Sequence, residues 1–369
     1  MKRSMAFGAG LTVAIGGLVW AIGACSDNKI KNDGGSGDSG FVSCHENMLM
    51  PGTFPDPSCD PGSIDSSCVG GMGKCTIDQK CGSQDTCLPL SSNAGKMVLD
   101  FRMRKLNVVA PTSLAGLQKI VIDKGVLLNT CGEKADGTFS WLLRVDKTAS
   151  TLLTGGAPPA ADPFSAYCFY RQKVNGLDIK PLTSKITFNG NTFATTDGLQ
   201  QLNIPIFVLG NPVPVILPVR GAKINAATID GDNCIGKFQK DALDVSCIEY
   251  DPATCPRWKP NGSLGGYITL EDADKVDVRE TNKTLCAQLT GDMSGPKIDI
   301  GGGFIISHCG RDAGMKLIAK GDYCEATKTA GGCQDSFWLA ATFAASAAKI
   351  DDPSTNPLCA QTQMDSGAD

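Results

Sequence analysis

From about residue 96 the chain alternates between apolar and polar residues, which is the pattern of half-buried β-strands. In residues 99–104, LDFRMR, apolar residues occupy one face of the expected strand and charged residues the other. Residues 139–145, FSWLLRV, predict a second strand, whose hairpin partner begins at Thr151. These segments indicate an antiparallel β structure.

In residues 186–193, Asn189-Gly190 separates two β-prone runs, and Asn-Gly is the strongest short signal for a hairpin. Only one helix is predicted, over roughly 270–276, because Thr269 and Asp272 form a capping box before it. Further strands are expected at 204–209, 213–224, 266–269, 303–307 and 336–343.

Many short strands separated by turn signals predict an all-β fold, a β-sandwich or jelly-roll-like domain. The alternating pattern and the turn residues extend over residues 93–362. A short tail, 363–369, is expected to be disordered.

The N-terminus predicts a secretory signal peptide over residues 1–24. Lys2 and Arg3 precede an uncharged apolar run, residues 5–24, which ends in small residues before Cys25. A transmembrane helix is the alternative, since the run is long enough to span a bilayer. Its glycines and the abrupt polar end argue against a helix.

Ile22-Gly23-Ala24-Cys25 resembles the lipobox of bacterial lipoproteins. The resemblance implies cleavage before Cys25 and acylation of that cysteine, and therefore attachment to a membrane through lipid. The other interpretation is a leftover cysteine in a membrane anchor. Ser26 follows the cysteine where lipoproteins retained in the inner membrane carry aspartate. We therefore expect an outer-membrane lipoprotein, on the periplasmic face or the cell surface.

Residues 25–42 combine the acylated cysteine with a polar, glycine-rich tether. Gly37-Asp38-Ser39-Gly40 matches a serine-protease tetrapeptide, but a flexible linker cannot hold a nucleophile in place.

A cysteine-rich module is expected over residues 43–92, where few large apolar residues are available to build a core. The spacing from Cys75 through Cys81 to Cys87 resembles short cysteine-rich repeats of extracellular knotted modules. The resemblance implies a spacer or interaction module that is crosslinked by disulfides. The cysteines of this module are Cys44, Cys59, Cys68, Cys75, Cys81 and Cys87.

The chain has 17 cysteines. Apart from Cys25, six lie before residue 92 and ten after it, so both numbers are even. An exported chain generally pairs its cysteines in disulfides. Connectivity stays open, although short loops favour Cys247 with Cys255 and pairs among Cys309, Cys324 and Cys333. Zinc is the alternative, but with only 2 histidines no metal site is expected. The ten cysteines of the β-rich domain are Cys131, Cys168, Cys234, Cys247, Cys255, Cys286, Cys309, Cys324, Cys333 and Cys359.

One wider resemblance lies in residues 130–172 and 216–290. The segments FSWLLRVD, TGGAPPAADPFSAYCFY, NCIGKF, GGYITLEDAD and TLCAQL are similar to an uncharacterised group of large secreted lipoproteins of myxobacterial type. This resemblance implies export and brings no activity with it.

The net charge of −4 is small and its charges are scattered, so the chain lacks the basic stripe that nucleic-acid binding requires. No motif indicates a cofactor. The remaining partner classes are the membrane, reached through the N-terminal lipid, and an unknown protein or glycan.

Two acidic segments are candidate calcium sites. Glu271, Asp272, Asp274 and Asp277 form a patch that could hold calcium, but acidic residues are also favoured at a helix N-terminus, which we prefer. The segment 230–233, DGDN, starts like a calcium loop but meets Cys234 where a ligand is needed.

Candidate catalytic groups are few. His308 beside Cys309 could act as a base next to a thiol, although a disulfide at Cys309 is the stronger expectation. Residues 301–303, GGG, indicate a turn before a strand. A set of aromatic residues could line a sugar-binding face or fill the core, and the core is favoured: Trp141, Tyr167, Tyr170, Trp258 and Tyr267.

The sequence thus predicts a lipid-anchored cell-envelope protein with a binding or structural role and no assigned catalytic residue. The alternative is a secreted hydrolase, acting on glycans, with a carboxylate pair in the β domain. Such a pair cannot be assigned from spacing, because the two carboxylates meet only in the fold.

Overall fold

The computed structural model describes residues 49–57, 88–114, 117–118, 122, 138–160, 162–208, 213–238, 258–351 and 359. These residues all belong to one structural unit, residues 40–369. The predicted signal peptide, Cys25, the tether and the tail 363–369 lie outside the described residues. No helix among the described residues is long and apolar enough to cross a membrane.

The described part of the chain is mainly β-structure, which confirms the all-β prediction. Its strands are β1 (Val98–Ala110), β2 (Ser140–Asp146), β3 (Thr151–Ala157), β4 (Gln172–Val174), β5 (Leu177–Ile179), β6 (Leu182–Asn189), β7 (Thr192–Thr195), β8 (Leu199–Ile206), β9 (Val215–Asp230), β10 (Cys234–Ile235), β11 (Lys237–Phe238), β12 (Trp258–Lys259), β13 (Gly262–Thr269), β14 (Asp277–Val278), β15 (Lys283–Thr284), β16 (Lys297–Asp299), β17 (Ile305–Ser307), β18 (Tyr323–Cys324), β19 (Thr329–Ala330) and β20 (Ser336–Ala347). Its helices are the 3-10 helices η3 (Thr112–Leu114) and η6 (Arg279–Thr281) and the α-helices α3 (Leu270–Ala273) and α4 (Leu285–Thr290).

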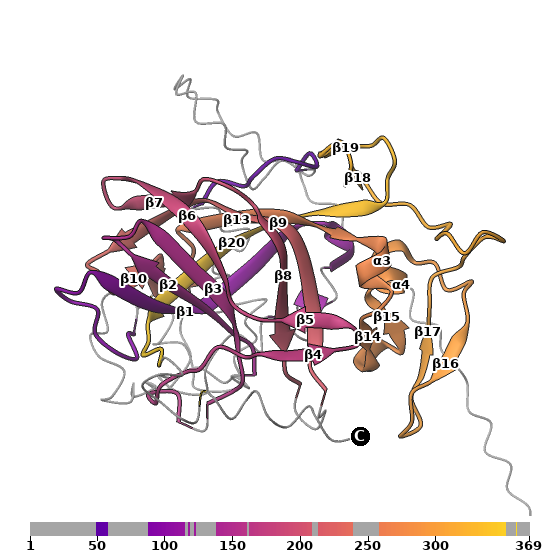
Figure 1. Ribbon diagram of the computed structural model, residues 1–369, viewed down its shortest axis with the longest axis horizontal. Coiled ribbons are helices and arrows are strands. Elements are labelled where there is room, and N and C mark those ends of the chain that lie inside the picture. Colours follow the sequence, from indigo (N-terminus) through magenta and orange to yellow (C-terminus); the bar gives the residue numbers. More distant parts are fainter. Residues whose placement is uncertain are drawn as a thin grey trace, which may run out of the picture. The chain divides into compact units, whose positions relative to one another are not determined.

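Eight of these strands close into an antiparallel barrel (Figure 1). They follow one another around the barrel in chain order, β1, β2, β3, β6, β7, β9, β13 and β20, and β20 pairs with β1 to complete the ring. β8 continues the course of β7 and pairs with the first half of β9. The arrangement differs from the expected sandwich or jelly roll, because pairing of the first and last strands joins all eight into one closed sheet.

Large apolar side chains fill the barrel. Phe101, Met103 and Phe343 are all fully buried, as the alternation of apolar residues predicts. The indole Nε1 of Trp141 donates a hydrogen bond of 2.8 Å to Thr154 Oγ1, so this polar atom is satisfied inside the core. A cavity of about 20 Å³ beside Trp141 has room for no more than about one water molecule. The interior is therefore a packed core, as expected for eight strands.

Close packing explains a glycine in β13. Gly262 lies directly opposite Phe343 on β20. A Cβ atom at position 262 would lie 2.5 Å from Phe343 Cζ, well inside van der Waals contact. The aromatic ring therefore covers the glycine backbone, and no larger residue fits there.

β1 is buried on both faces, whereas its charged residues were expected on an exposed face. Arg102 and Arg104 point outward from the barrel but are fully buried beneath other segments. The guanidinium group of Arg102 lies over the ring of Tyr167, at 5.8 Å, and that of Arg104 lies over Trp258, at 4.7 Å. Segments that are distant in sequence thus cover this strand, which local alternation cannot reveal.

Parts of the predicted cysteine-rich module pack on the outer face of the barrel. The ring of Phe54 contacts Trp338 edge-on at 5.5 Å, and Trp338 Nε1 donates to the carbonyl oxygen of Thr53. Leu90 donates a backbone hydrogen bond of 2.8 Å to Ala347 in β20. The module's cysteines, from Cys44 to Cys87, lie outside the described residues.

Every described cysteine is disulfide-bonded. The bridges are Cys168–Cys359, Cys286–Cys309 and Cys324–Cys333, and Cys234 is bonded as well. The expected pairing among Cys309, Cys324 and Cys333 is therefore found for Cys324 with Cys333. Cys131, Cys247 and Cys255 lie outside the described residues.

A smaller sheet, ordered β14-β15-β17-β16, follows the barrel strand β13 in the chain. α3 begins after Thr269, whose Oγ1 accepts a hydrogen bond from the Asp272 amide as predicted, but the helix ends at Ala273. α4 was not expected from the sequence. Its N-cap, Thr284, accepts in the same way from the Ala287 amide, and Gly291 ends the helix in a left-handed conformation.

Candidate functional site

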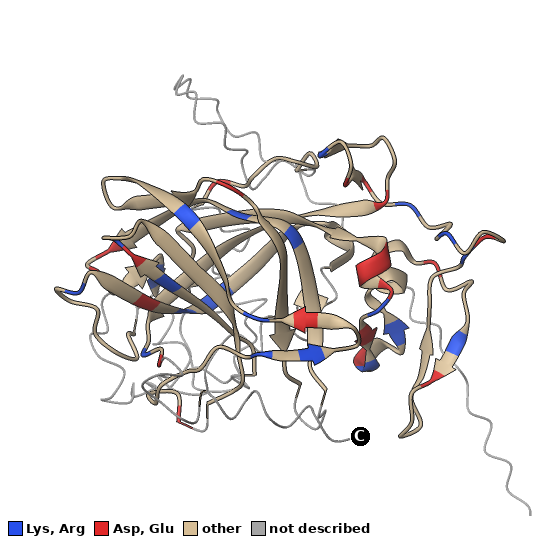
Figure 2. Ribbon diagram, in the orientation of Figure 1, with Lys and Arg blue, Asp and Glu red and all other residues tan. Residues whose placement is uncertain are grey.

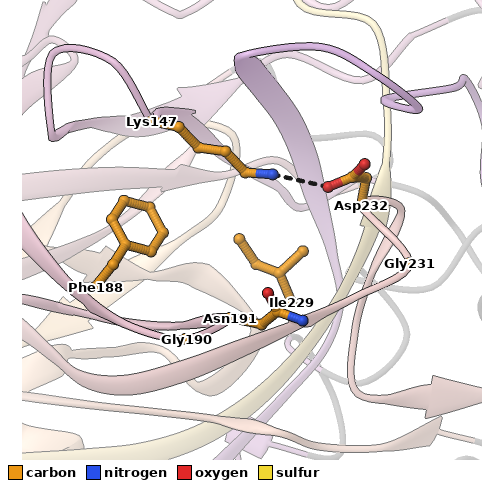
Figure 3. A pocket seen from close by; sticks show the side chains of 7 residues that line it. All are labelled: Lys147, Phe188, Gly190, Asn191, Ile229, Gly231 and Asp232. Carbon is orange, nitrogen blue, oxygen red and sulfur yellow. Dashed lines mark hydrogen bonds and ion pairs between the residues drawn. The ribbon is translucent and has the colours of Figure 1, made fainter.

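A pocket of about 350 Å³ lies at one end of the barrel, among three strand connections (Figure 3). Lys147 comes from the connection between β2 and β3. Phe188 near the end of β6 and Ile229 near the end of β9 also line the pocket. The turns that follow these two strands supply the other lining residues, Gly190, Asn191, Gly231 and Asp232.

Left-handed residues shape the two turns that form most of this pocket. The hairpin predicted at Asn189-Gly190 is present, but its turn lies one residue further on, at Gly190-Asn191, because Asn189 pairs with Thr192. Gly190 has φ +59°. Gly231 and Asp232 also adopt positive φ, +55° and +60°, at the end of β9. The segment considered as a calcium loop is therefore a hairpin turn.

An ion pair crosses the pocket. Lys147 Nζ lies 2.8 Å from Asp232 Oδ1, and the two side chains retain 32% and 35% of their exposure. The hydrogen bond from Lys147 lowers the pKa of Asp232 below its usual range, against the opposing effect of burial and with help from the charge of Lys147 and the Gly95 backbone. The Asp232 carboxyl group is thus ionised at neutral pH, and both side chains are accessible to solvent.

The pocket combines this ion pair with an apolar wall. In Figure 3 Lys147 and Asp232 face each other along the top, while Phe188, Ile229 and Asn191 lie below them. Phe188 is half-buried and Asn191 is exposed. An aromatic face, an amide and a pair of opposite charges can together hold a small neutral polar molecule. The described lining residues of the pocket include no serine, cysteine or histidine.

A second polar cluster lies beside α3. Arg220 Nε donates to Asp272 Oδ2 at 2.7 Å, and Arg220 Nη1 donates to Glu325 Oε1 at 2.9 Å. Burial raises the pKa of Asp272, but hydrogen bonds from Arg220 and Lys275 outweigh burial and hold the pKa below its usual range. Asp272 is therefore ionised at neutral pH and cannot act as the proton donor that glycoside hydrolysis requires.

The remaining residues of the predicted acidic patch also have protein partners. Arg311 Nη2 lies 2.9 Å from Glu271 Oε2 and 3.2 Å from Asp274 Oδ2. Asp277 is half-buried, and burial raises the pKa of its carboxyl group. Glu271 and Asp272 lie in the first turn of α3, where the preferred interpretation places them, whereas Asp274 and Asp277 follow the helix.

His308 and Cys309 do not form a nucleophilic pair. The sulfur of Cys309 is bonded to Cys286, and the His308 Nδ1 atom lies 3.5 Å from Asp274 Oδ1. Asp274 also accepts a hydrogen bond of 3.0 Å from the Cys309 amide. This cluster consequently braces the region where β17 ends.

The aromatic residues considered as a sugar-binding face belong to the core. Each has less than a tenth of its surface exposed, which confirms the preferred interpretation: Trp141, Tyr167, Tyr170, Trp258 and Tyr267. The pocket residues Lys147, Phe188 and Asn191 were missed by sequence analysis. The Asn-Gly turn marked their neighbourhood, but no local signal indicated that three connections meet at one end of a barrel.

Comparisons of the chain with protein-family models, curated proteins and solved structures found no match. The function is therefore inferred from the sequence and from the geometry of the site.

Proposed function

We propose that the protein is a lipid-anchored cell-envelope protein whose barrel binds a small polar ligand, a saccharide, in the pocket beside Lys147 and Asp232. The observation that carries the binding role is the accessible pocket itself, with its ion pair above an aromatic wall.

The cellular location has two kinds of support. The sequence carries a signal-like N-terminus and the lipobox-like Ile22-Gly23-Ala24-Cys25. All described cysteines are oxidised to disulfides, which persist in compartments beyond the cytosol. Acylation of Cys25 would attach the barrel to the outer membrane and present its pocket to soluble or surface-bound glycans.

The ligand class follows from the lining of the pocket. A sugar ring has an apolar face, which suits the half-buried ring of Phe188. Its hydroxyl groups suit the charged atoms of Lys147 and Asp232 and the amide of Asn191. A cavity of about 350 Å³ has the size of one to two sugar rings. A secreted hydrolase has no comparable support among the described residues.

The binding role is tested with the full chain and a panel of free mono- and disaccharides, using ligand-observed NMR. We expect at least one saccharide to bind, and Phe188→Ala to weaken that binding by about tenfold or more. Lys180→Ala is the control, because its ion pair with Asp178 joins two exposed side chains outside the pocket. Failure of every saccharide to bind, or equal loss in the control, would contradict the proposal.

The anchor is tested separately with Cys25→Ser. We expect the wild-type protein to incorporate labelled palmitate and to sediment with membranes, and the variant to do neither. If both forms behave alike, the protein is not anchored through this cysteine.

A further inference from the structure

β16 forms an exposed edge of the smaller sheet. It pairs with β17 on one side, and in the described part of the chain no strand follows it on the other. All three of its residues, Lys297, Ile298 and Asp299, are exposed. Figure 1 shows the β16–β17 hairpin extending beside the barrel, and Figure 2 shows a basic and an acidic residue close together on β16.

The hydrogen bonds around β16 establish which residues face the open edge. His308 donates to the carbonyl oxygen of Pro296, and Ile300 donates to that of Phe304, both at 3.1 Å. Backbone groups along a strand alternate between its two sides. The groups of residues 296, 298 and 300 therefore point toward β17, and those of Lys297 and Asp299 point away from it.

We propose that β16 pairs antiparallel with β16 of a second copy of this chain, about a two-fold axis at Ile298. In this register Lys297 lies opposite Asp299 of the second copy, and Asp299 lies opposite its Lys297. Each of these pairs exchanges two backbone hydrogen bonds through the groups that face the edge. The two Ile298 side chains meet at the axis as a close pair.

Charge selects this register over its neighbours. Moving the second strand by two residues places either Lys297 opposite Lys297 or Asp299 opposite Asp299, and like charges directly opposite are destabilising. Moving the second strand by one residue places a residue whose backbone groups point to the open edge opposite one whose groups point to its own β17. The hydrogen bonds between the two copies are then lost. Beyond the charged pairs lie Gly295 and Gly301, which have no side chain to obstruct the approach.

The surroundings are compatible with such a contact. Asp299 Oδ1 accepts a hydrogen bond from the Gly301 amide at 2.8 Å, which leaves Oδ2 to meet a lysine. Ile298 is 45% exposed, and Ile305, on the neighbouring strand, is 53% exposed. Charged residues on an edge strand usually prevent pairing. On β16, however, a two-fold axis places each charged residue opposite a residue of opposite charge in the second copy.

The test uses two charge reversals in the full chain, Lys297→Asp and Asp299→Lys. The first makes the edge wholly acidic and the second wholly basic, so each variant should repel itself. We expect sedimentation equilibrium to show concentration-dependent dimers for the wild type, and about tenfold or more weaker self-association for each variant.

Mixing the two variants gives the decisive result. The two acidic side chains on β16 of the first variant then face the two basic side chains on β16 of the second. A heterodimer should therefore form with a Kd within about threefold of the wild-type value. Lys320→Asp, on an exposed residue outside β16, controls for net charge. A monomeric wild type at about 1 mM, or a mixture that associates no better than its components, would overturn the proposal.

Discussion

Replacement of Arg220 by methionine should destabilise the barrel by an amount that depends on pH. Arg220 joins β9 to α3 through Asp272, whose side chain is only 3% exposed. Stranding a buried carboxylate costs about 3–5 kcal/mol. Lys275 Nζ remains 3.0 Å from Asp272 Oδ1 and offsets part of this cost. We therefore expect Arg220→Met to lower the free energy of unfolding by about 2–3 kcal/mol at pH 7.

The pH dependence follows from the pKa of Asp272. In the wild type this pKa lies below its unfolded value, so the carboxylate contributes stability above about pH 4, and that stability is lost as the pH falls further. In Arg220→Met the hydrogen bond from Arg220 no longer counters the effect of burial on Asp272, so the pKa of Asp272 rises. The difference between wild type and variant should therefore be complete at pH 7 and shrink as the pH falls through about 4.

Urea denaturation with the disulfides intact measures both effects. Lys180→Met is the matched control, since it removes an ion pair of 2.6 Å between side chains that are more than half exposed, and should change stability by less than about 1 kcal/mol. A loss for Arg220→Met that is equally large at pH 4 and pH 7, or no greater than that of the control, would refute the role assigned to Asp272.

Three further predictions concern the core and the pocket. Gly262→Ala should destabilise the protein by about 1–3 kcal/mol in chemical denaturation, because its Cβ would overlap the buried Phe343 ring. Phe343→Ala should cost about 3–5 kcal/mol by leaving a cavity, and in that background Gly262→Ala should cost much less, as a double-mutant cycle would reveal. Lys147→Ala should raise the pKa of Asp232 toward its usual value in an NMR titration, with less than about 1 kcal/mol lost in stability; an unchanged pKa would show that the ion pair does not form.

The sequence predicted at least part of each of the eight barrel strands, because alternation and turn chemistry are local, but it missed most of the short strands outside the barrel. The Thr269 cap is present as expected, and so is the β6–β7 hairpin, with its turn one residue later than Asn189-Gly190. Closure into a barrel was not predictable, because it depends on pairing between β1 and β20, which are far apart in the chain. The buried guanidinium groups of Arg102 and Arg104 were missed for the same reason, since distant segments cover them.

The pocket was less accessible to sequence reasoning than the fold. Asp232 drew attention only as part of a possible calcium loop, and its partner Lys147 carried no signal at all. Their contact exists because the β2–β3 connection and the β9–β10 turn project from the same end of the barrel. A site formed from connections therefore becomes visible only when the order and direction of the strands are known.

The pairing of β1 with β20 also determines when the barrel can close during folding. Its first strand begins at Val98 and its last ends at Ala347, so the ring stays open until β20 is available to pair with β1. Until then β1 and β13 lack a shared neighbour, and their backbone groups are available to incorrect partners. The edges of β1 and β13 therefore stay open to incorrect pairing until β20 lies between them.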